Sequence, residues 1–234
     1  MSTPRTHLYS RLTASLIAGA MSMAAMLPAS AALIIDNTTT GKYNTGLGIL
    51  LDTNGFSDPI PCANMGCGDA MLNFASAPNL SAASAALGNW LTNPAAPGGT
   101  WTGTQAIPQT WVVNDETAVI YAFNAQSGLT NVSLQLGVDN GIFVWLDGNY
   151  VFGARAGGGS LLGEYTPTLG NIGAGIHYLQ LLREDHGGLT GYDIRMTADF
   201  VRPSVPEPDS LWLLGLGVLG LIAARRRNAM ANRR

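Results

Sequence analysis

The chain has 234 residues, a formal net charge of −3 and two cysteines, and hydrophobic residues make up 47% of it. That length and apolar content suit one domain with a hydrophobic core. Within residues 32–204, five basic and thirteen acidic side chains give a charge of −8, with a single lysine. Because proteins bind nucleic acid by neutralising phosphates, this charge argues against a nucleic-acid partner and leaves neutral sugars and divalent cations.

The N-terminus has the pattern of a secretory signal peptide. Two arginines precede the apolar stretch 12–27, Pro28 breaks it, and residues 29–31 read Ala-Ser-Ala. This pattern predicts cleavage by signal peptidase before Ala32, with residues 1–31 removed. The alternative is an uncleaved anchor, which the proline and the small residues at the cleavage position disfavour.

The two cysteines, Cys62 and Cys67, lie close together in the sequence. Export takes them to an oxidising compartment, where neighbouring thiols usually pair, so we expect a disulfide that closes a short loop. A zinc site is the alternative, but His177 and His186 have no zinc-like spacing to the two cysteines.

Short apolar runs separated by turn residues predict strands along residues 32–204. They lie at residues 32–35, 47–51, 111–113, 117–123, 132–136, 142–146, 176–183 and 192–200. Alternation is clearest in the last of these, which indicates one buried and one solvent-facing side. One helix is predicted at residues 82–91, with Ser81 as N-cap. The expected fold is all-β, an antiparallel, jelly-roll-like β-sandwich with one short helix.

Two segments, 137–151 and 173–184, stand out within this domain. The first segment has an acidic-Gly turn, an apolar strand, an Asp-Gly turn and a second strand. The second segment is a strand that has Gly and His near its start and carries Glu184. This order resembles the central hairpins of the protective-antigen-type β-sandwich, a domain often attached to glycosidases and adhesins. That family usually has two acids before the first glycine, whereas here the second position is Asn140.

The Asn-Gly pair at 140–141 and the Asp-Gly pair at 147–148 each suit a type I′ hairpin turn. The alternative is a binding site at the rim of the sandwich, in which oxygen atoms hold Ca²⁺ or sugar hydroxyls. Its candidate ligands are Asp139, Asn140 and Asp147. Trp101 lies among glycines and threonines and is the tryptophan expected to be exposed, where it would stack on a sugar ring.

No motif for a reaction is present, so we expect a protein that is not an enzyme. There is no Gly-x-Ser-x-Gly elbow and no phosphate-binding loop. Glycoside hydrolysis needs two carboxylates across a cleft. The acidic pairs at 115–116 and 184–185 are adjacent, and neighbours on a strand point to opposite faces. Because loops can bring distant acids together, a secreted glycan-cleaving enzyme stays an alternative.

The C-terminal residues 205–234 have three parts. Pro206, Glu207 and Pro208 come first, residues 211–224 are apolar, and Arg225, Arg226 and Arg227 follow. As a helix, the apolar part would span about 21 Å, short of the ~30 Å hydrocarbon core. We therefore expect a marginal transmembrane helix with the domain outside and the arginines inside. A plain C-terminal anchor is the alternative.

The three parts together resemble the PEP-CTERM sorting signal of Gram-negative bacteria. The resemblance implies recognition of Pro206, Glu207 and Pro208 by an exosortase, a membrane cysteine protease or transpeptidase. It also implies a bacterium that builds an extracellular polysaccharide matrix, or biofilm. The expected protein is held in the envelope, processed, and released to the cell surface or matrix, where it binds or organises exopolysaccharide. A structural matrix or adhesion protein without a small ligand is the alternative.

Overall fold

A computed structural model describes residues 31–51, 72–156, 159–185, 187–202 and 210–231. Its strands are β1 (Ala32–Asp36), β2 (Thr40–Gly48), β3 (Leu72–Asn73), β4 (Gln105–Ala106), β5 (Glu116–Asn124), β6 (Leu129–Leu146), β7 (Asn149–Ala156), β8 (Ile176–Glu184) and β9 (Gly191–Phe200). The helices are a 3-10 turn (Ser81–Ala83), α1 (Ser84–Leu87) and α2 (Ser210–Ala231). The signal peptide up to residue 30, Cys62, Cys67 and the Pro-Glu-Pro triplet lie outside the described residues.

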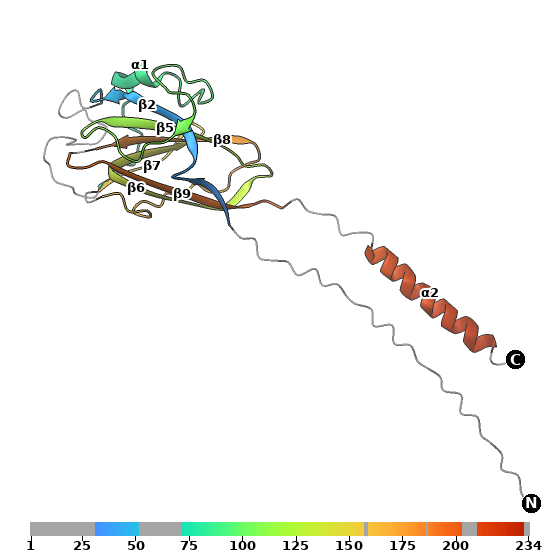
Figure 1. Cartoon of the computed structure of the whole chain (residues 1–234). Helices are drawn as coiled ribbons and strands as arrows, with labels where there is room; N and C mark the ends of the chain where they lie inside the picture. The colour runs from blue at the N-terminus through green and yellow to red at the C-terminus, as the bar shows by residue number, and fades with distance from the viewer. Residues whose placement is uncertain (1–30, 52–71, 157–158, 186, 203–209, 232–234) are drawn as a thin grey trace, which may run out of the picture.

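The strands pair antiparallel and form a curled sheet with two layers (Figure 1). The strand order is β1-β9-β6-β8-β5-β2-β4, with β7 beside β6 and β3 beside β7. The first part of β6, up to Asp139, pairs with β9, whereas its second part, from Asn140, pairs with β7 and β8. One long strand thus belongs to both layers. The predicted all-β, antiparallel sandwich is confirmed.

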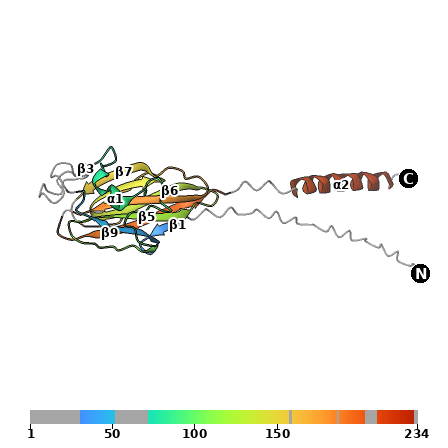
Figure 2. The same ribbon diagram turned by 90° about the horizontal axis from the view of Figure 1, so that it is seen from above.

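The larger layer is buried on both faces because side chains alternate along its strands. On β5, Val119 and Tyr121 enter the core between the layers. Ala118 and Ile120 enter a second core on the outer face. The 3-10 turn, α1 and the loops around them cover that outer face and place Trp90 in its centre, against Trp145. Figure 2 shows α1 lying over the sheet.

The predicted helix at residues 82–91 is much shorter in the structure. Only Ser84–Leu87 is α-helical, after a single 3-10 turn. Ser81 is not the N-cap, and its N–H instead donates to Asn79 Oδ1 at 3.0 Å. The helix ends because Gly88 takes a φ of 57°, at a point where a Cβ would overlap the Pro97 carbonyl oxygen. Close packing of the loop at residue 97 therefore limits the helix.

Three other predictions of local structure were wrong. The pair 140–141 is not a hairpin turn but lies inside β6, where Asn140 pairs with Ala156. Residues 111–113 are not a strand, and β2 ends at Gly48 instead of continuing to Leu51. By contrast, β1, β5, β8 and β9 lie where the sequence predicts strands.

The C-terminal helix α2 is longer than the predicted 211–224 and runs through the three arginines. Within the described parts of the chain, no helix is both long and apolar enough to cross a membrane, so the predicted transmembrane helix is not confirmed.

The first and last strands of the domain are neighbours. Ala32 pairs with Ala198, so the start of β1 and the end of β9 lie at the same end of the strands (Figures 1 and 2).

Candidate functional site

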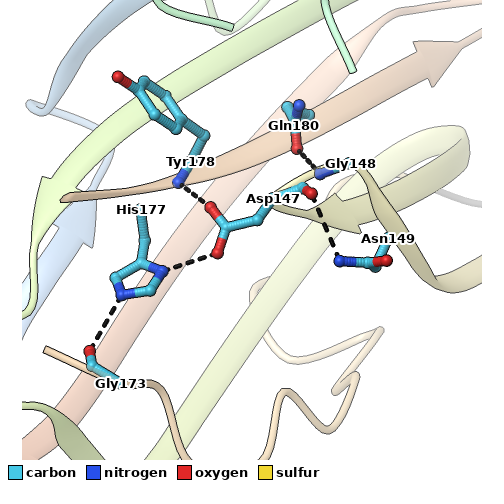
Figure 3. Close-up of polar contacts among 7 residues, drawn as sticks. All are labelled: Asp147, Gly148, Asn149, Gly173, His177, Tyr178 and Gln180. Carbon is cyan, nitrogen blue, oxygen red and sulfur yellow. Dashed lines mark hydrogen bonds and ion pairs between the residues drawn. The ribbon is translucent and has the colours of Figure 1, made fainter. Parts of the chain in front are cut away.

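Asp147 lies in the turn between β6 and β7, and its own protein occupies both of its carboxylate oxygens (Figure 3). Oδ1 accepts a hydrogen bond from the backbone N–H of Tyr178 at 2.8 Å. Oδ2 lies 2.7 Å from His177 Nδ1, and His177 Nε2 lies 2.9 Å from the Gly173 carbonyl oxygen. The carboxylate therefore fastens the turn to the start of β8.

The turn itself has the geometry that the Asp-Gly pair predicts. Asp147 has a φ of 51° and Gly148 a φ of 77°, so both central residues are left-handed as a type I′ turn requires. Gly148 N–H donates to Gln180 Oε1 at 2.9 Å, which gives the turn a second attachment to β8. His177 is a residue of β8 (Ile176–Glu184), and both of its ring nitrogens make polar contacts.

The predicted rim site is not assembled. Asp139 and Asn140 lie midway along β6, and Asp147 follows the end of that strand. At about 3.3 Å per residue, roughly 25 Å of strand separates Asp139 from Asp147. Asn140 is buried, and its carbonyl oxygen accepts from Tyr165 Oη–H at 2.8 Å. Among the described residues, no group of three His, Cys, Asp or Glu side chains could hold a metal ion.

Trp101, by contrast, lines an open concavity. The indole is half-buried, not exposed as expected, and stacks on Trp90 with ring centroids 5.8 Å apart. Its Nε1–H donates to the Leu87 carbonyl oxygen at 2.9 Å, which fixes the ring orientation. The concavity has a volume of about 440 Å³. Its lining residues are Lys42, Ala96, Pro97, Gly98, Gly99, Trp101 and Thr102.

A smaller concavity adjoins the first and shares Lys42 with it. Its volume is about 140 Å³, and its other lining residues are Thr40, Gly41, Pro94, Thr104, Ile120, Ala122 and Tyr178. It lies over β2, β5 and β8 on the outer face of the larger layer. Lys42 Nζ donates to the Ala95 carbonyl oxygen at 2.8 Å, across the boundary between the two concavities. Sequence reasoning missed Lys42 and Tyr178, although Lys42 is the only lysine of the domain.

The buried acids of the domain do not line either concavity. Glu116, Glu184 and Asp185 are each at most 1% exposed. Glu164 accepts from the Val138 N–H at 3.3 Å, and burial raises the pKa of its carboxyl despite this bond. The walls of the two concavities thus present an aromatic face, hydroxyls, backbone and one ammonium, a set suited to binding.

Residues 204–227 match the family model of the PEP-CTERM protein-sorting motif. The chain is therefore a protein with a PEP-CTERM sorting signal: it is exported, and an exosortase processes it at the membrane. No curated protein matches the chain. The resemblance of the central hairpins to protective-antigen-type domains stays a prediction.

Proposed function

We propose that this exported protein binds the extracellular polysaccharide of a Gram-negative bacterium and does not cleave it. The observation that carries the proposal is the Trp101 concavity. An indole ring held against Trp90 on one side offers a rigid apolar surface to the face of a sugar ring. The volume of the concavity falls in the range of about 300–1,000 Å³ that is usual for ligand sites.

Polar groups around the ring would fix the orientation of a sugar. Thr102 Oγ1 accepts from the Tyr43 N–H at 3.1 Å and keeps its own O–H for a ligand. Gly98 has open space where a side chain would begin, which leaves that part of the wall uncovered. A hydroxyl-rich ligand also suits the acidic domain better than nucleic acid does, because its binding does not depend on neutralising a phosphate backbone.

The test is a glycan array probed with the protein purified after export, with and without Ca²⁺, and including the producing bacterium's own exopolysaccharide. Ala96 and Ala95 are both exposed, but only Ala96 lines the concavity. Ala96→Met should therefore weaken binding about 10-fold, whereas the matched Ala95→Met should not. If the wild-type protein binds no glycan, the proposal fails, and equal losses in the two variants would exclude this site. Release of sugar fragments would show cleavage.

A structural or adhesive role has one observation in its favour. Val112, Leu161 and Leu189 are 66%, 74% and 77% exposed, on loops near the start of β9. The first and third loops adjoin, because Thr190 Oγ1 accepts from the N–H of residue 111 at 2.9 Å and donates to its carbonyl at 2.9 Å. Sedimentation velocity of the wild type and of Leu189→Ser in the absence of sugar tests this alternative. Self-association of the wild type that Leu189→Ser abolishes would support it.

A further inference from the structure

Lys42 lies at the boundary between two concavities, and among the described residues neither has another charged side chain in its lining. It is on β2 and pairs with Ile120 of β5 on the outer face of the sheet. Its Nζ makes one hydrogen bond, to the Ala95 carbonyl oxygen at 2.8 Å. An ammonium group has three N–H donors, so two remain for a ligand.

An aromatic side chain stands on each side of Lys42. Trp101 lines the larger concavity and Tyr178 the smaller one. In Figure 3 the Tyr178 ring points away from Asp147, whose carboxylate holds the Tyr178 backbone through the N–H bond at 2.8 Å. Tyr178 pairs with Ala122 of β5, whose exposed side chain forms part of the floor. Both aromatic positions are thus fixed by elements of the sheet or by α1.

From this arrangement we infer that the two concavities form one extended site for an internal segment of an anionic polysaccharide. A carboxylate substituent of one sugar contacts Lys42, and sugar rings lie in the concavities on either side. The inference rests on the proposed function and adds to it the charge and the minimum length of the ligand.

The charge of the domain makes this position distinctive. Residues 32–204 carry −8, so an anionic polymer would be repelled over most of the surface. Two of the other four cations, Arg155 and Arg183, are buried. A carboxylate that reaches Lys42 would therefore find an ammonium group with no acid among the described residues of the surrounding wall. This local contact would select which sugar of the polysaccharide lies at Lys42.

The test uses the exported protein and two matched pairs of trisaccharides: trigalacturonate and trimannuronate, each with its carboxyl-reduced, neutral counterpart. Titration calorimetry is run at an ionic strength of about 0.15 M, where the Debye length of about 8 Å limits long-range repulsion. Lys42→Gln removes the ammonium, Lys42→Arg keeps the charge, and Arg195→Gln removes an exposed cation on β9, in the other layer.

We expect the wild type to prefer the acidic member of at least one pair by about 5-fold. Lys42→Gln should abolish this preference, whereas Lys42→Arg and Arg195→Gln should keep it. Ala122→Met, which fills the smaller concavity, should weaken trisaccharide binding and leave monosaccharide binding unchanged.

A wild type that binds the neutral and acidic members equally, or a preference that survives in Lys42→Gln, overturns the anionic ligand while polysaccharide binding stands. Trisaccharides that bind no tighter than monosaccharides overturn the extended site. Absence of binding to every polysaccharide and trisaccharide refutes the proposed function itself.

Discussion

The wall of the Trp101 concavity offers a matched pair of substitutions that tests how closely its loop packs on α1. Gly98 and Gly99 have φ values of 71° and 65°, so alanine at either position would be left-handed. That conformation costs roughly 1–2 kcal/mol. At Gly98 a Cβ would meet nothing within 4 Å, whereas at Gly99 it would overlap the Ala86 carbonyl oxygen. Because that oxygen belongs to backbone and cannot rotate away, Gly99→Ala should cost a further 1–3 kcal/mol.

The free energy of unfolding of the two variants can be measured with urea, using the intrinsic fluorescence of the five tryptophans as the probe. We expect Gly98→Ala to lose about 1–2 kcal/mol and Gly99→Ala about 2–5 kcal/mol, with equal denaturant dependence. The difference between the variants is the informative quantity, since the cost of the left-handed conformation is common to both. Equal losses would mean that the loop does not press on α1 as described.

Three further predictions concern the core, the alkaline range and the tail. Arg183 is fully buried between the rings of Tyr192 and two other aromatic residues. Thermal unfolding should show a loss of about 4 kcal/mol of stability for Arg183→Ala and clearly less for Arg183→Met, because methionine keeps most of the side-chain volume. Equal losses in the two variants would contradict a packing role. Burial raises the pKa of Tyr150 to about 12 and also raises that of Tyr192, whereas an unfolded tyrosine titrates near 10. Their contribution to stability is therefore complete below pH ~10 and is lost as pH rises. Tyr150→Phe lacks the hydrogen bond to the Phe74 carbonyl at 2.7 Å, so each protein is compared with its own stability at pH 7. Urea unfolding between pH 7 and about 11.5 should show a smaller drop in stability for Tyr150→Phe than for the wild type, and equal drops would contradict the raised pKa. Glu207→Ala should leave the sorting tail on the protein, which mass spectrometry of the exported material would show as the full mass of the tail. Removal of the tail as in the wild type would contradict recognition of the Pro-Glu-Pro triplet.

Much of the fold could be predicted because alternating apolar residues define strands locally. The run that became β9 has one buried and one more exposed side, as its alternation indicates. The prediction of a turn at 140–141 was wrong because pairing with strands on both sides overrides the local turn preference of Asn-Gly. Gly141 pairs with Arg155 on β7 and with Glu184 on β8, and these long-range pairings decide its conformation.

The candidate site was only partly predictable. Trp101 was singled out from its glycine- and threonine-rich surroundings, but its partners came from distant parts of the chain. Lys42 and Tyr178 meet because β2 and β8 both pair with β5, an arrangement that local composition does not reveal. The Ca²⁺ ligands proposed from sequence adjacency do not meet, because the second part of β6 lies between Asp139 and Asp147 as one extended strand.

The position of β9 in the sheet has a consequence for export. The last strand to leave the secretion channel is inserted between β1, the first strand, and β6. Every intermediate that lacks β9 leaves β1 and the first part of β6 without the strand that joins them, and the core without Ile194, Met196 and Ala198. The sandwich can therefore close only after the chain has been exported nearly as far as its sorting signal. Completion of the fold and arrival of the sorting signal at the membrane thus follow each other closely in time.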